Sequence, residues 1–280
     1  MSKSFKVDLL IIDPQQDFCN PKGFPYEGTL YVKGAENDMD RLTKFVKRSL
    51  GKFNDIHVTL DSHHSIDIGH AAYWRDSKGN RLDPFSCISA DDLKSGKVRT
   101  FIPSLQRRAE KYADELNKSG RYPMIVWPTH CLIGTPGHNV YLPLAEALRE
   151  WEDAAGAVVD YVTKGANPHT EHYSAIKAEV PDPTDETTQL NARLIDALTN
   201  VDEVAIAGEA LSHCVANTVR DIATAFKNAD YVKKLVLLED CSSPVPNSPG
   251  GPDFEKMASD FVSDMKKLGM RVAKSTDYLK

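Results

Sequence analysis

The sequence lacks long hydrophobic runs and has no excess of positive charge. In the N-terminal stretch the only apolar run is Leu9 to Ile12, which is too short for a signal peptide or a membrane span, and no later run reaches membrane length. Among the 280 residues, 34 Lys and Arg stand against 40 Asp and Glu, which gives a net charge of −6. We therefore expect no membrane association and no nucleic-acid partner.

Cysteine is also scarce, and its spacing is irregular. The five cysteines are an odd number without a CxxC pair, which argues against a disulfide framework, a zinc ribbon and a CxxC redox motif. This usage is typical of a reduced, cytoplasmic protein. A hydrophobic content of 41% excludes disordered and collagen-like classes, and the absence of a repeat of 20 to 50 residues excludes solenoids and propellers.

Short apolar runs rich in β-branched residues recur along the chain, with helix-like periodicity between them. The runs are Val7 to Ile12, His57 to Leu60, Met124 to Trp127, Val158 to Val162, Val204 to Ala207 and Leu235 to Leu238. Continuous apolar strands that alternate with helices predict an α/β fold, with a doubly wound, mostly parallel sheet and helices on both faces. The length fits one large domain over residues 1–280.

A polar or reactive residue follows five of these runs. Ligands of open parallel sheets bind beyond the carboxyl ends of the strands, so these residues are candidates for a functional site. They are Asp13, Asp61, His130, Lys164 and Cys214.

Three of them suggest a nucleophilic site. Cys214 follows a strand and a turn and is expected to open a helix, where the helix dipole favours a thiolate and free N–H groups can hold an oxyanion. Lys164, followed by Gly165, needs a carboxylate partner if it is buried, and Asp13 can supply one. Each residue alone has an ordinary interpretation: a capping carboxylate, a surface lysine and a small buried hydrophobe.

A second group suggests a metal site. Asp61, His63, His70 and His130 combine a carboxylate with imidazoles at neighbouring strand ends, which is the ligand pattern of a catalytic metal with open positions. We expect a divalent metal, with Zn²⁺ preferred and Fe²⁺ or Mn²⁺ as alternatives. His64 is interpreted as a bystander. The other histidines, His138, His169, His172 and His213, are interpreted as structural or supporting residues.

Five segments together resemble a known family. They are IIDPQQDFC, TLDSHHSIDIGH, VWPTHCLIGTPGHNV, VTKGANPHTEHYSA and AIAGEALSHCVANTVRDI, in this order. In these segments the sequence resembles the nicotinamidases and related cysteine hydrolases of the isochorismatase-like superfamily. The resemblance implies a catalytic triad of Asp13, Lys164 and Cys214. It also implies the metal ligands Asp61, His63 and His130, with His70 as a further ligand in some relatives.

The resemblance implies further features of the site. The N–H groups of Ala210 and Cys214 would form the oxyanion hole, a cis peptide would join Glu209 to Ala210, and Phe18 and Trp127 would wall the substrate pocket. The implied activity is hydrolysis of nicotinamide to nicotinate and ammonia through a thioester on the cysteine. True isochorismatases lack the nucleophilic cysteine, so Cys214 argues against that reaction.

Two segments depart from the family pattern and leave the substrate open. Residues 71–103 and 179–189 have the character of insertions close to the expected pocket. The alternatives are a related cysteine hydrolase acting on another small amide or carbamoyl substrate, a metal-hydroxide hydrolase in which Cys214 is a core residue, and a scaffold without catalysis. Besides the small-molecule amide, association into a homo-oligomer is compatible with the sequence, which does not fix the number of copies.

Overall fold

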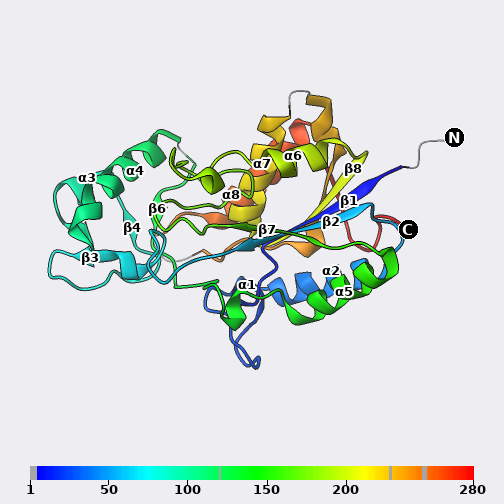
Figure 1. Ribbon diagram of the computed structural model, residues 1–280, viewed down its shortest axis with the longest axis horizontal. Coiled ribbons are helices and arrows are strands. Elements are labelled where there is room, and N and C mark those ends of the chain that lie inside the picture. Colours follow the sequence, from blue (N-terminus) through cyan, green and yellow to red (C-terminus); the bar gives the residue numbers. More distant parts are fainter. Residues whose placement is uncertain (1–4, 120, 227–228, 248–250) are drawn as a thin grey trace.

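A six-stranded parallel sheet forms the centre of the protein (Figure 1). The computed structural model describes residues 5–119, 121–226, 229–247 and 251–280. All neighbouring strands in the sheet are parallel, in the order β10-β9-β8-β1-β2-β7. Their bounds are β1 (Val7–Ile12), β2 (Asp55–Asp61), β7 (Asp160–Lys164), β8 (Glu203–Gly208), β9 (Leu235–Leu238) and β10 (Arg271–Ala273).

The central strands are buried on both faces. All six residues of β1 and all four of β9 are buried, as continuous apolar runs predict. Five of the six apolar runs identified in the sequence lie in this sheet, which confirms the predicted α/β class. The edge strand β10 was not predicted, because its three residues are exposed or half-buried and carry little apolar signal.

Helices cover both faces of the sheet. On one side lie α2 (Ala35–Arg48) and α5 (Leu142–Ala155), with the single turn α1 (Gln16–Cys19) beside them, and on the other lie α6 (Ala192–Thr199), α7 (Ala216–Ala225) and α8 (Phe254–Lys267) (Figure 1). Each helix buries an apolar stripe, such as Leu42, Phe45 and Val46 on α2. Among the described residues, no helix is long and apolar enough to cross a bilayer.

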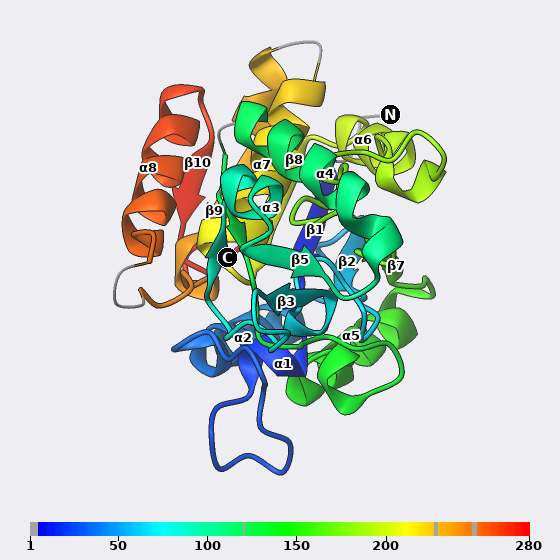
Figure 2. The same ribbon diagram turned by 90° about the vertical axis from the view of Figure 1, so that its left-hand side faces the viewer.

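A smaller lobe with its own apolar core lies beyond the carboxyl edge of the sheet (Figures 1 and 2). It contains two antiparallel pairs of strands, β3–β5 and β4–β6, and two helices packed on each other. The bounds are β3 (Trp74–Asp76), β4 (Cys87–Ile88), α3 (Ala90–Lys94), β5 (Val98–Thr100), α4 (Gln106–Ser119) and β6 (Met124–Ile125). Residues 71–103 lie within this lobe; that they and residues 179–189 are insertions remains a prediction.

The prediction of a main-sheet strand over Met124 to Trp127 is wrong. Only Met124–Ile125 is a strand, and it pairs antiparallel with β4 in the lobe. The side chains of this segment alternate between two cores: Met124 and Val126 pack in the lobe, whereas Ile125 and Trp127 pack in the main core. An apolar run that joins two cores has the composition of a buried strand, which explains the error.

Candidate active site

The strand ends bring the predicted catalytic residues together at the carboxyl edge of the sheet. Asp13 follows β1, and Asp61 and Lys164 end β2 and β7 in direct register with each other. β8 lies against the other side of β1, and its last residue, Gly208, is so close that a side chain there would collide with the Ile12 backbone. The turn that follows β8 therefore starts directly beside Asp13.

The triad predicted from the sequence is assembled in the structure. The Lys164 ammonium lies 2.8 Å from Asp13 Oδ2, 3.1 Å from Asp61 Oδ1 and 3.7 Å from Cys214 Sγ. All four side chains are buried. One cation thus lies between two carboxylates and the thiol, and this attraction to opposite charges is what makes burial of the lysine tolerable.

Neighbouring groups fix the triad in position. Thr59 Oγ1 donates to Asp13 Oδ1 at 2.6 Å, and Lys164 Nζ also donates to the carbonyl of His172 at 2.9 Å. Gly165 has φ of 84°, and a Cβ there would lie 2.7 Å from Asp61 Oδ1. The glycine behind Lys164 is required both by its backbone conformation and by the close approach of Asp61.

Cys214 is held in a π-helical turn, Leu211–Val215, that precedes α7. The prediction that Cys214 opens a helix is therefore approximate, because α7 itself begins two residues later. Burial raises the pKa of the Cys214 thiol well above its usual range, and Lys164 offsets this only in part, so the surroundings of the sulfur oppose the thiolate that a helix N-terminus would favour. A thiol in such surroundings becomes a nucleophile only if a base removes its proton.

Asp13 is placed to be that base. One of its carboxylate oxygens lies within 4.8 Å of Cys214 Sγ, and Lys164 Nζ lies close to both. Burial raises the pKa of Asp13, while Lys164 lowers it. A buried carboxylate with an elevated pKa accepts a proton from a neighbouring thiol more readily than an ordinary aspartate does.

The predicted metal ligands also gather. The ring nitrogens of His63, His70 and His130 lie within 4.8 Å of one another. Asp61 Oδ2 lies 3.1 Å from His63 Nε2 and 3.6 Å from His130 Nε2. Asp61 therefore belongs to both groups, because its other oxygen contacts Lys164.

These residues fit a divalent cation. His63 Nε2 is buried and makes no aligned hydrogen bond among the described residues, although Asp61 Oδ2 lies 3.1 Å away, while its Nδ1 is held 3.0 Å from Asp67 Oδ2. A carboxylate behind a ligating imidazole is the usual arrangement that orients it toward a metal. Burial, together with neighbouring His130 and His63, lowers the pKa of His70 to about 2, so its ring is in the neutral form that binds metals.

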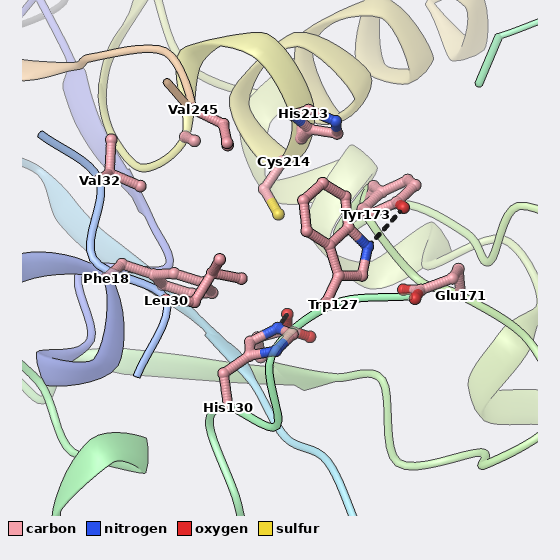
Figure 3. A pocket seen from close by; sticks show the side chains of 12 residues that line it. Phe18, Leu30, Val32, Trp127, His130, Glu171, Tyr173, His213, Cys214 and Val245 are labelled. Atoms are coloured by element: carbon pink, nitrogen blue, oxygen red, sulfur yellow. Dashed lines mark hydrogen bonds and ion pairs between the residues drawn. The ribbon is translucent and has the colours of Figure 1, made fainter. Parts of the chain in front are cut away.

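A pocket of aromatic and aliphatic side chains opens onto Cys214 (Figure 3). Both predicted wall residues, Phe18 and Trp127, line it, as do Asp61, His130 and Ala210. The rest of the lining, which sequence reasoning missed, is Leu30, Val32, Glu171, Tyr173, His213 and Val245. The structure also has the expected cis peptide between Glu209 and Ala210.

Three of the missed residues are polar. Glu171 points toward His130 in Figure 3; its Oε1 has no hydrogen-bond partner in the described part of the chain, and burial raises its pKa to about 8. The hydroxyl of Tyr173 accepts a hydrogen bond from Trp127 Nε1 at 2.9 Å. Burial lowers the pKa of His213 to about 3, so its ring is neutral. The segment VTKGANPHTEHYSA contains two of the three, but its spacing has no strand or helix period that would place them.

Gln15 is a further residue that sequence reasoning missed. Its side-chain amide donates to the Asp61 carbonyl and accepts from the Asp61 N–H, both at 2.7 Å. This pair of bonds joins the chain just after β1 to the end of β2. Gln15 thereby fixes the backbone of the carboxylate that the triad and the histidines share.

Comparison with known proteins supports the fold. No family model and no curated protein matches the sequence. Among solved structures, a nicotinamidase and pyrazinamidase from Acinetobacter baumanii has 21% identity and a TM-score of 0.60 over 99% of this chain and all of that one. The yeast nicotinamidase Pnc1p bound to the inhibitor nicotinaldehyde has 20% identity and a TM-score of 0.61, over 96% of this chain and 99% of that one.

A pyrazinamidase from Pyrococcus horikoshii in complex with zinc is also similar. It has 18% identity and a TM-score of 0.55, over 96% of this chain and 99% of that one. At these identities the likeness concerns the fold. The chain therefore has the isochorismatase-like α/β fold of these proteins, which confirms the fold that the five sequence segments imply.

Proposed function

We propose that the protein is a cysteine amidohydrolase that converts nicotinamide to nicotinate and ammonia. The observation that carries this proposal is the position of Cys214 Sγ at the wall of an aromatic pocket, 3.7 Å from Lys164 Nζ and within 4.8 Å of an Asp13 carboxylate oxygen. The nicotinamidases among the structural neighbours support the choice of reaction. Figure 3 shows the Cys214 sulfur facing the cavity between Phe18 and Trp127.

The acylation half of the reaction uses the triad. Asp13 takes the proton of the Cys214 thiol, and the sulfur attacks the amide carbonyl carbon. Lys164 stabilises the anionic pair, and the N–H groups of Ala210 and Cys214 stabilise the oxyanion of the tetrahedral intermediate. As this intermediate collapses, the carbon–nitrogen bond breaks and protonated Asp13 gives its proton to the nitrogen. Ammonia departs, and the acyl group remains bound to Cys214 as a thioester.

The deacylation half returns the enzyme to its starting state. Asp13, again a carboxylate, takes a proton from water as the water oxygen attacks the thioester carbonyl. The carbon–sulfur bond breaks, protonated Asp13 returns its proton to the sulfur, and the carboxylic acid is released. Asp13 alternates between accepting and donating a proton during the cycle, and an elevated pKa favours both roles.

The pocket suits a flat, uncharged ring. Its walls are mostly aromatic and aliphatic, and Lys164, the cation nearest the sulfur, is fully engaged by Asp13, Asp61 and the His172 carbonyl. A primary amide on a heteroaromatic ring places its carbonyl at Cys214 and its ring between Phe18 and Trp127. Another small aromatic amide of this shape is the alternative substrate.

We further propose that Asp61, His63 and His130, with His70, hold a divalent cation, with Zn²⁺ preferred. Bound there, the cation supplies a Lewis acid that orients a ring nitrogen or lowers the pKa of water. Asp61 and His130 line the pocket, so the cation would face the substrate. The position of Asp61 and His130 in the pocket lining also supports the rival function, a metal-hydroxide hydrolase in which Cys214 takes no part.

One experiment separates these functions. Ammonia release from nicotinamide is measured for the wild type, the Cys214→Ala variant and a chelator-treated sample. A cysteine amidohydrolase loses more than about 10⁴-fold of its turnover in Cys214→Ala, while nicotinamide binding measured by calorimetry persists. Full turnover in Cys214→Ala together with loss on chelation would establish the metal-hydroxide hydrolase. No release by the wild type would direct the search to other aromatic amides and carbamoyl compounds.

A further inference from the structure

A buried carboxyl group that the proposed mechanism does not use lies behind the catalytic turn. Glu209 immediately precedes Ala210 and is completely buried. The side chain lies among groups from α1, α2 and the segment after β9. A glutamate side chain without solvent contact needs hydrogen-bond partners for both oxygens. Its negative charge must also be compensated by a cation or removed by protonation.

One oxygen of Glu209 has a clear partner. The Ser243 N–H donates to Glu209 Oε2 at 3.1 Å. The negative charge of Asp38 on α2, which is itself buried and paired with Arg41, acts on this carboxyl group and raises its pKa. Glu209 Oε1 and Asp38 Oδ2 are buried and have no hydrogen-bond partner among the residues in the described ranges.

A single proton accounts for both unpartnered oxygens. Two carboxylates in contact repel each other, whereas a carboxylic acid donates to a carboxylate and satisfies both. Arg41 stabilises the charge on Asp38, so the proton belongs on Glu209. Burial and the negative charge of Asp38 raise the pKa of Glu209 well above its usual range.

Among the described residues, Arg41 is the cation that lowers the pKa of Glu209. The charged and titratable groups that face Glu209 are Asp38 and Arg41 from α2 and the Cys19 thiol from α1. Burial and nearby acids raise the pKa of Cys19 as well, so it contributes no charge at neutral pH. Glu209 is therefore a neutral hydrogen-bonding group under ordinary conditions.

Glu209 also lies at one end of a set of hydrogen bonds that joins the catalytic turn to the segment after β9. Besides the Ser243 N–H bond, the Leu211 N–H donates to the Ser243 carbonyl at 2.8 Å, and the Val245 N–H donates to Ser212 Oγ at 3.1 Å. The side chain of Val245 is part of the pocket wall. A shift of Glu209 would therefore move both Ala210 and the part of the pocket wall that contains Val245.

We propose that Glu209 is a positioning residue that acts as a neutral acid: bonded to Asp38 and to the Ser243 N–H, it holds the Ala210 amide at the oxyanion position. The proposal rests on the proposed amidohydrolase function. It does not require Glu209 to touch the substrate. Above the pKa of Glu209, a second negative charge beside Asp38 would break the arrangement, and activity would fall.

The protonation of Glu209 is tested first, because this test does not depend on the function. The infrared difference spectrum of wild type minus Glu209→Gln at neutral pH is expected to show the carbonyl stretch of a protonated carboxylic acid, which disappears at alkaline pH. A difference spectrum with only carboxylate bands would overturn the proposal. If the wild type hydrolyses no nicotinamide, the proposed function fails while this result still decides the state of Glu209.

The kinetic test compares Glu209→Gln with Glu209→Leu. Gln keeps one donor and one acceptor, so it should retain kcat within about threefold at neutral pH and keep more activity than the wild type at alkaline pH. Leu has neither group, so kcat should fall about 10- to 100-fold, somewhat less than the loss of an oxyanion donor itself, with KM changed by less than about threefold.

Nicotinaldehyde gives a readout of the oxyanion position. An aldehyde adds to a thiol, and the oxygen of the adduct occupies the place of the oxyanion. The inhibition constant of nicotinaldehyde should rise in Glu209→Leu by about the factor by which kcat falls. If Glu209 had a merely structural role, the inhibition constant of the folded variant would be unchanged. Equal losses in the Gln and Leu variants would overturn the proposal.

Asp38→Asn keeps the proposal testable if the Leu variant does not fold. Removing the charge of Asp38 lets Glu209 ionise at lower pH, because its main repulsive neighbour is gone. The infrared band should therefore disappear at a lower pH than in the wild type. A band that titrates at the same pH in both proteins would show that the two carboxyl groups are not coupled.

Discussion

Lys164 Nζ lies 3.1 Å from Asp61 Oδ1 and thereby joins the nucleophilic triad to the histidine cluster. The other oxygen of Asp61 contacts His63, so one carboxylate serves both groups. A change in the charge of either group is therefore felt by the other through a single buried side chain.

Asp13→Asn should separate the reactivity of Cys214 from catalysis. Asp13 raises the pKa of the thiol, and removing its charge should lower that pKa. Alkylation of Cys214 by iodoacetamide at neutral pH should therefore be at least as fast as in the wild type, whereas ammonia release falls by about 10²-fold or more because the base is lost. Both are measured in a Cys87→Ser background, which removes the exposed thiol. Slower alkylation of the variant would contradict the prediction that Asp13 keeps Cys214 in the protonated thiol form.

Lys164→Met should destabilise the protein as well as inactivate it. The substitution keeps the length of the side chain but leaves Asp13 and Asp61 buried without their cation. Breaking a buried pair in this way costs about 3–5 kcal/mol, which denaturant unfolding measures. Lys47→Met, which removes a half-exposed pair with Glu150, is the matched control and should cost no more than about 1 kcal/mol. Equal costs would show that Lys164 does not stabilise the two buried carboxylates.

Asp67→Asn should weaken metal binding without removing a ligand. Asp67 holds His63 through Nδ1, so the variant should lower metal affinity about 10- to 100-fold. Competition with a chromogenic chelator measures the affinity, and elemental analysis gives the stoichiometry. His64→Ala changes an exposed neighbour and should have no effect. Wild-type protein that binds no divalent metal would refute the metal site.

His57 should make stability depend on pH. Burial alone would lower the pKa of His57, but hydrogen bonds and charge interactions with Asp8 and Asp160 outweigh it and raise the pKa. A raised folded-state pKa means that this contribution is complete below the unfolded pKa of about 6.5 and is lost as pH rises through the folded value.

The expected result for the wild type is an unfolding free energy that declines above about pH 6.5, part of which comes from His57. His57→Gln cannot take up a proton and should flatten that decline. Denaturant unfolding at a series of pH values measures both proteins. If the two curves are parallel, His57 is not charged in the folded state.

Tyr173→Phe should weaken substrate binding. The hydroxyl accepts the Trp127 indole N–H, and its loss leaves a buried donor unsatisfied at a cost of about 1–3 kcal/mol. Because Trp127 lines the pocket, KM should rise several-fold while kcat changes less. Tyr161→Phe, at a half-exposed position on β7, is the control and should leave KM unchanged. An unchanged KM in Tyr173→Phe would mean that the indole is held by packing alone.

The sequence by itself determined the class of fold and the chemistry at the strand ends. Apolar runs such as Val7 to Ile12 report burial on both faces, and that burial requires a covered parallel sheet. The carboxyl ends of parallel strands share one edge, so Asp13, Asp61 and Lys164 had to lie near one another. The quoted motifs added Ala210, Phe18 and Trp127 by resemblance, and all three line the pocket.

Only the tertiary structure decided which core a segment joins and which loops reach the site. Met124 to Trp127 has the composition of a central strand, yet it joins two cores because the lobe competes for its side chains. Glu171, Tyr173 and Val245 reach the pocket from irregular segments, where no periodicity relates position to direction. The protonation states of Cys214 and Glu209 were also beyond the sequence, because a pKa depends on burial and on neighbours that are distant along the chain.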